Sequence, residues 1–143
     1  MAPTVFRIFL GLVALYAMLR GSRDARLVGV ICVVGALTTH LVISPLSQRF
    51  ESVETPVMMV DIAVFAGFLF VALRSDRFWP LWIAGLQLTT MMGHIMKAID
   101  VELLPRAYAA AMAFWAYPIV LILAIGTYRQ QRRRQRADTV QPA

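Results

Sequence analysis

Three side chains able to carry proton-transfer or ligand-binding chemistry lie inside strongly apolar stretches of this chain: His40, Asp61 and His94. An ionisable residue is costly inside a segment that crosses a membrane, so its presence there is a reason to look for a function. Imidazole and carboxylate together can share a proton, bind a cation or hold a polar headgroup such as that of a quinone. The alternative is that these groups only join helices through hydrogen bonds, each contributing about 0.6–2 kcal/mol.

His94 belongs to a row of four polar residues within the otherwise apolar residues 79–100. The row is Gln87, Thr90, His94 and Lys97, at spacings of three, four and three residues. On a helix these spacings place all four side chains on one face. Such a face is unfavourable against lipid, so we expect it to contact other protein or a water-filled cavity. The sequence names no partner for Gln87 and Thr90, and for these two we expect simple packing.

Two cofactors are compatible with this pattern. His40 and His94 can act as a pair of metal ligands or as the axial ligands of haem b. Copper(I) is the second possibility, because thioether sulfur together with imidazole suits this soft ion. Two of the apolar stretches contain five of the eight methionines: Met58, Met59, Met91, Met92 and Met96. Methionine is also an ordinary filler of apolar gaps, so the pattern by itself does not require a metal.

The elements that carry these residues are apolar runs of membrane-spanning length. The chain is 59% hydrophobic with a mean hydropathy of +0.68, whereas a soluble domain is about 45–50% apolar. About 20 apolar residues span the roughly 30 Å of a bilayer core as a helix. We therefore predict an all-α, polytopic membrane protein, a five-transmembrane-helix bundle with spans at residues 4–19, 27–45, 56–73, 78–99 and 104–128. The first span is interpreted as a retained helix because arginines, not a signal-peptide cleavage site, follow it.

The basic residues predict how this bundle is oriented. With five spans, ten of the 14 Lys and Arg residues fall on the side of the C-terminus and four on the other side. The positive-inside rule then favours an N-out/C-in arrangement in the inner (cytoplasmic) membrane. We expect residues 129–143 to be a disordered cytoplasmic tail that contacts anionic lipid headgroups. The net charge of +6 is explained by these flanking segments, so no nucleic-acid partner is expected.

The same topology places the three ionisable residues at one depth. His40 and His94 each lie about five residues before the outer end of a span, and Asp61 lies about five residues after the outer start of another. At 1.5 Å per residue, all three are expected about 8 Å below the outer surface of the hydrocarbon. His40, Asp61 and His94 therefore form a predicted cluster, contributed by three helices.

The sequence contains no recognised catalytic motif, so an enzyme acting on a lipid-soluble substrate is the third and least favoured of three hypotheses. The prediction is a small inner-membrane protein that serves as an accessory or self-associating component, with the bilayer, other membrane subunits or further copies of itself as partners. The second hypothesis is a binder or carrier of a proton, metal ion, haem or quinone at the predicted His/Asp cluster. Its candidate ligand-binding or proton-relay residues are His40, Asp61 and His94, together with Gln87, Thr90 and Lys97 of the polar row.

Overall fold

The computed structural model describes residues 2–43, 55–99 and 105–140, and within these ranges the chain is almost entirely helical. The helices are α1 (Ala2–Arg20), α2 (Arg23–Val42), α3 (Thr55–Arg74), α4 (Trp79–Ile99) and α5 (Pro105–Val140). The predicted all-α class is confirmed, and each helix contains most of one predicted span.

Capping explains why α2 begins at Arg23 and not at residue 27, where the apolar run starts. The hydroxyl of Ser22 accepts a hydrogen bond from the backbone N–H of Ala25, and Asp24 places a negative charge in the first turn. The carboxylate of Asp24 also accepts a hydrogen bond of 2.7 Å from Ser75. This bond links the start of α2 to the turn between α3 and α4.

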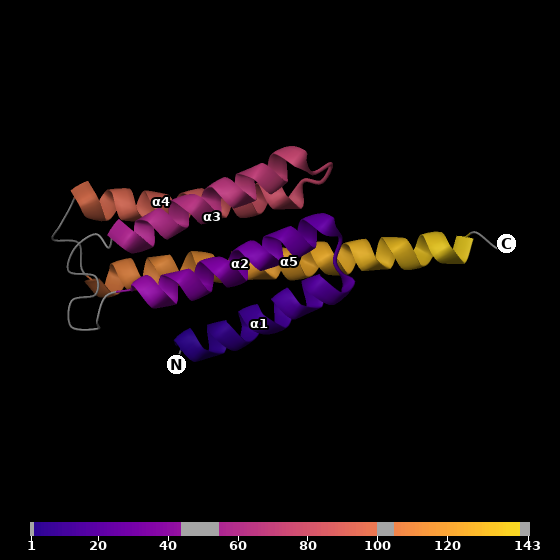
Figure 1. Ribbon diagram of the computed structural model, residues 1–143, viewed down its shortest axis with the longest axis horizontal. Helices are drawn as coiled ribbons and strands as arrows, with labels where there is room; N and C mark the ends of the chain where they lie inside the picture. Colours follow the sequence, from indigo (N-terminus) through magenta and orange to yellow (C-terminus); the bar gives the residue numbers. More distant parts are fainter. Residues whose placement is uncertain (1, 44–54, 100–104, 141–143) are drawn as a thin grey trace.

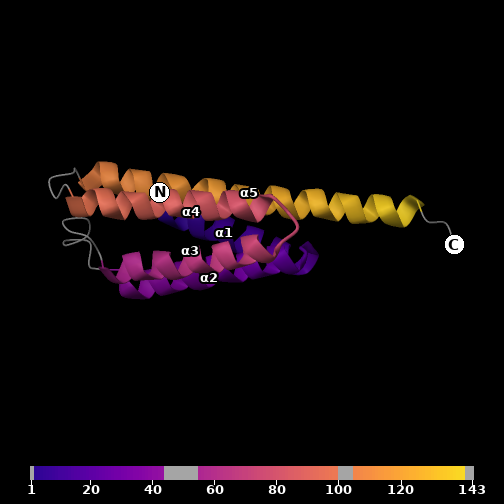
Figure 2. The same cartoon turned by 90° about the horizontal axis from the view of Figure 1, so that it is seen from above.

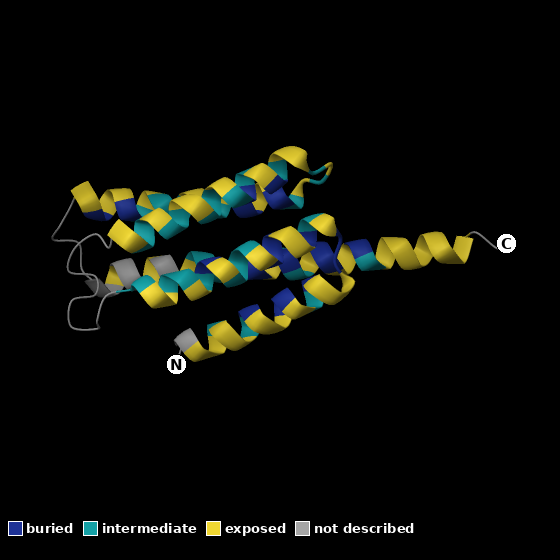
Figure 3. Ribbon diagram, viewed as in Figure 1, coloured by how far each residue is buried: buried dark blue, intermediate teal, exposed yellow. Residues whose placement is uncertain are grey.

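The five helices pack side by side into an elongated bundle (Figures 1 and 2). Each helix contacts its neighbour in sequence, and α5 closes the arrangement by packing against α1 and α2. The apolar core lies in the half of the bundle from which the end of α5 projects (Figure 3). It is formed by Leu10, Val13, Ala17, Ala25, Val28, Phe68, Val71, Ile83, Ala84, Ile119, Val120 and Leu123. The opposite half contains the ionisable residues singled out from the sequence.

A glycine brings α2 and α3 close together in that polar half. A Cβ atom added to Gly35 would lie 2.6 Å from Cγ2 of Val64, closer than a real contact allows. Small residues at helix interfaces let two backbones approach in this way. Gly35 therefore sets the spacing of α2 and α3 next to the candidate site described below.

The basic segment after residue 128 differs from our expectation. Residues 129–143 were predicted to be disordered, but α5 continues without interruption to Val140 and projects beyond the other helices (Figure 1). Arginine, glutamine and alanine have high helix propensity, and extending an existing helix avoids the cost of nucleation. The hydroxyl of Tyr16 also donates a hydrogen bond of 2.8 Å to Oε1 of Gln131, which ties the start of this extension to α1. Residues 141–143 lie outside the described part.

Large apolar side chains are exposed on the outside of every helix. Examples, one from each helix in order, are Leu12, Leu37, Phe70, Leu88 and Leu121. Among the described residues, two helices, α2 and α3, are long and apolar enough to cross a membrane. The structure thus supports the helical bundle, and it supports membrane-spanning character for two of its helices by length and composition.

Candidate functional site

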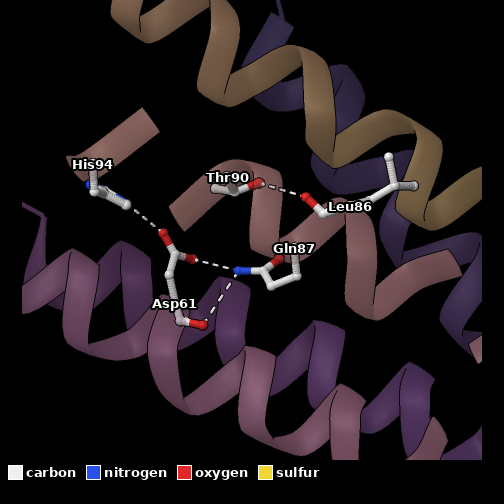
Figure 4. A network of polar contacts seen from close by, with 5 residues as sticks. All are labelled: Asp61, Leu86, Gln87, Thr90 and His94. Carbon is white, nitrogen blue, oxygen red and sulfur yellow. Dashed lines mark hydrogen bonds and ion pairs between the residues drawn. The ribbon is translucent and has the colours of Figure 1, made fainter. Parts of the chain in front are cut away.

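Asp61 of α3 is the centre of a polar cluster between α3 and α4 (Figure 4). Its Oδ2 lies 2.7 Å from Nε2 of His94, and its Oδ1 accepts a hydrogen bond of 3.2 Å from Nε2 of Gln87. With Asp61 ionised, Nε2 of His94 is the donor, so each carboxylate oxygen accepts one hydrogen bond. His94 and Gln87 are buried and Asp61 is partly buried, which strengthens these bonds by shielding them from water.

The spacing of Gln87 and His94 explains why both reach one carboxylate. They are seven residues apart, so they lie on the same face of α4, about two turns or 10.5 Å apart along its axis. Asp61 extends from α3 toward the space between them (Figure 4). Our expectation of simple packing for Gln87 was therefore wrong, because its amide is a direct partner of the carboxylate.

The remaining two residues of the polar row are also turned inward. Thr90 donates a hydrogen bond of 3.4 Å to the carbonyl of Leu86 in its own helix, and Lys97 is buried. All four residues of the row are thus buried. The prediction that this face of α4 contacts other protein is confirmed.

His40 of α2 has a partner that the sequence reasoning missed. The guanidinium of Arg7 on α1 donates a hydrogen bond of 3.0 Å to Nδ1 of His40. Arginine is only a donor, so Nδ1 is the acceptor in this contact and the neutral ring carries its proton on Nε2. The sequence does contain a signal for this contact. Arg7 lies inside an apolar run, and α1, which carries it, directly precedes the helix that carries His40.

A cavity of about 350 Å³ is lined both by the Arg7–His40 pair and by the Asp61–Gln87 pair. All five helices contribute to its wall. Its polar lining is Arg7, Thr39, His40, Asp61 and Gln87. The apolar part of the wall includes Phe6, Leu10, Val64, Phe68, Ile119 and Val120. A volume of this size lies within the range of about 300–1,000 Å³ typical of small-molecule sites, which combine an apolar wall with a few polar groups.

The cavity has opposite charges on its two sides. Arg7 is cationic and exposed, together with His40, on the α1–α2 side. Asp61 and Gln87 lie toward the interior on the α3–α4 side, and His94 stands behind Asp61 without lining the cavity. A ligand here would meet hydrogen-bond donors at one end and a carboxylate acceptor at the other.

The two histidines have different partners, which bears on the predicted cofactors. Nε2 of His94 faces Asp61, whereas Nδ1 of His40 faces Arg7. Among the described side chains, no group of three or more His, Cys, Asp or Glu residues is arranged to hold a metal ion. Metal binding by His40 and His94, haem b and copper therefore stay predictions made from the sequence.

Similarity to known proteins adds no information about this site. Comparison of the chain with protein-family models, with curated proteins and with solved structures found no match. The function is therefore argued from the geometry of the cavity and of the helix surfaces.

Proposed function

We propose that this chain is an integral membrane protein whose five helices all span the bilayer. The first support is the surface of α2 and α3, where only 17% and 11% of the apolar window is buried within the bundle. A core helix of a soluble protein would bury most of such a window, whereas a helix surrounded by lipid would not. The second support is α4, whose polar row is buried while Leu88 and Met92 on other faces are exposed. The polar side chains of α4 are thus concentrated on the face that lipid would not meet.

The proposed orientation is N-out/C-in in an inner membrane, from the distribution of Lys and Arg. In this orientation the Asp61 cavity belongs to the outer half of the bundle, and the projecting end of α5 belongs to the cytoplasmic side. The role of an accessory or self-associating component stays a prediction, tested by co-purification with other membrane subunits in mild detergent.

Membrane integration is tested by alkaline extraction. After a carbonate wash of membranes from cells that express the protein, we expect it to remain in the pellet, because apolar helix surfaces keep it in the bilayer. A peripheral protein held only by charge is released by the same wash and serves as the control. Recovery of this chain in the supernatant would exclude the five-span bundle.

We further propose that the cavity binds a lipid-soluble molecule with a quinone-type headgroup. The observation that carries this proposal is the apolar cavity with Arg7 and His40 at one side and Asp61 at the other. A carbonyl oxygen of such a headgroup would accept hydrogen bonds from Arg7 and from Nε2 of His40, and a hydroxyl of the reduced form would donate to Asp61. The apolar wall would contact the ring and the first part of the chain.

Binding of a decyl-chain benzoquinone and of its quinol to the detergent-purified protein tests this proposal. We expect Arg7→Gln and His40→Gln each to weaken binding about tenfold, the effect of losing one hydrogen bond to a charged or buried group. Both side chains are exposed, so their replacement should leave the bundle intact. Asp61→Asn should weaken binding of the quinol more than of the quinone, because only the quinol donates to the carboxylate.

The matched control is Arg20→Gln, which removes an exposed arginine from α1 outside the cavity lining. It should leave both affinities unchanged. The proposal fails if the unmodified protein binds neither form, or if Arg20→Gln weakens binding as much as Arg7→Gln does. The affinities are measured by titration calorimetry at fixed detergent concentration.

A further inference from the structure

A groove of about 260 Å³ lies between α1 and α2, next to the Asp61 cavity. We refer to it as the α1–α2 groove. Its lining is mostly apolar and consists of Arg7, Leu10, Gly11, Val33, Ala36, Leu37 and His40. Two of these residues from each helix also line the cavity. The groove and the cavity therefore adjoin along the edge at which α1 meets α2.

The helical positions of the lining residues place the groove on the surface of the bundle. Gly11, Val33 and Leu37 line the groove and not the cavity, and each directly follows a residue of the cavity lining. One residue corresponds to about 100° of rotation around a helix axis. On both helices the side that faces the groove is thus turned away from the cavity. Leu37 is 60% exposed, so this side belongs to the surface that the proposed bilayer surrounds.

The cavity opens toward this groove. Among the described residues of the cavity lining, Arg7 and His40 are the exposed ones, and the others are buried or partly buried. Both also belong to the groove lining. The cavity volume of about 350 Å³ is near the lower end of the range of about 300–1,000 Å³ for small-molecule sites, so a headgroup fits but a long chain does not fit as well. The chain of a ligand held there must leave past Arg7 and His40.

The groove continues from this polar pair toward the middle of the two helices. On α1, Leu10 lies three residues after Arg7. On α2, which runs the opposite way, Ala36 lies four residues before His40 (Figure 1). Both apolar residues line the groove and the cavity, about one turn deeper than the Arg7–His40 hydrogen bond. In the proposed orientation, this path leads from the level of the headgroup toward the centre of the bilayer.

The α1–α2 groove has free room at Gly11. A Cβ atom added to this glycine would have nothing packed against it within 4 Å. Gly29 of α2 lies nearer the other end of the same interface, and a Cβ atom added there would lie 3.6 Å from Cβ of Ala17. The two helices are therefore in close contact near Gly29 and leave space at Gly11.

We propose that the α1–α2 groove holds the apolar chain of the ligand whose headgroup occupies the Asp61 cavity. The ligand is then a quinone-type molecule with a long alkyl or isoprenoid chain, an inference that rests on the proposed function. The headgroup accepts hydrogen bonds from Arg7 and His40, and the chain passes Leu10 and Ala36 into the groove. The shared lining favours this occupant over an unrelated lipid, because a headgroup in the cavity fixes where its own chain emerges.

The test compares two benzoquinones with the same ring, one without a chain and one with a decyl chain, at fixed detergent concentration. A chain gains little by moving from a micelle into an apolar groove, because both surroundings are apolar. The decisive experiment therefore blocks the groove. Gly11→Leu places an apolar side chain in the open space, and leucine has a higher helix propensity than glycine. We expect it to weaken binding of the decyl compound about tenfold relative to the chainless compound.

Gly85→Leu is the matched control. Gly85 is an exposed glycine of α4 with equally open space around it, and it lines neither the cavity nor the groove. This variant should leave both affinities unchanged. In a second measurement on the unmodified protein, a photoreactive diazirine at the end of the decyl chain should label Val33 or Leu37, as located by mass spectrometry of the peptides. An excess of the unlabelled decyl compound should prevent this labelling.

The possible failures are distinguishable. If the unmodified protein binds neither compound, the proposed function itself is wrong. If it binds both, but Gly11→Leu affects both equally or neither, the groove assignment alone is wrong. Labelling on helices other than α1 and α2 would also exclude the groove. Labelling of Val33 or Leu37 that an excess of the decyl compound does not prevent indicates unspecific contact with dissolved chains, and it too overturns the proposal.

Discussion

Replacing Asp61 with alanine should lower the free energy of unfolding by about 2–4 kcal/mol, because it removes the acceptor of two hydrogen bonds from buried groups. Nε2 of His94 loses its partner at 2.7 Å, and Nε2 of Gln87 loses its partner at 3.2 Å. Gln87 keeps its longer bond of 3.5 Å to the backbone carbonyl of residue 61, and it lines the cavity. His94 is buried away from the cavity, so there water cannot easily replace the carboxylate. The measurement is reversible unfolding in mixed micelles.

A double-mutant cycle shows whether this loss comes from the pair itself. Asp61→Ala, His94→Ala and the double variant should give a coupling energy of about 1–3 kcal/mol, as groups in direct contact do. Asp138→Ala is the matched control, since it removes an exposed carboxylate from the projecting part of α5 and should be nearly neutral. Additive effects of Asp61→Ala and His94→Ala would contradict the contact.

Replacing Leu123 with alanine should destabilise the bundle by about 2–5 kcal/mol, the range for a buried leucine that leaves a cavity. Leu123 is 0% exposed and lies in the apolar core with Val120 and Phe68. The helices pack closely around Leu123. The cavity left by the substitution therefore cannot close unless these helices move. Thermal unfolding in detergent measures the effect.

Leu121 provides the matched control in the same helix. It is 52% exposed, and Leu121→Ala removes the same atoms from a surface that detergent or lipid can fill. We expect it to change stability by less than about 1 kcal/mol. Equal losses for Leu121→Ala and Leu123→Ala would mean that α5 is rotated relative to the core described above.

Helix content was predictable because it depends on local sequence. Apolar runs bounded by arginines and by Pro56 indicated where helices lie, and each was found in the described residues. The extension of α5 to Val140 was not predicted, although its arginines and glutamines are good helix formers. Net charge suggested a disordered tail, but a helix that has already formed is extended at little cost.

The position of a residue along its helix could also be predicted from the sequence alone. Counting from the helix ends put His40, Asp61 and His94 at one level, and the structure joins Asp61 to His94. Rotation about each helix axis depends on how all five helices pack, and no single segment contains that information. Only the tertiary structure therefore decided that Gln87 is the second partner of Asp61 and that His40 pairs with Arg7. The same packing decided that these two pairs share one cavity.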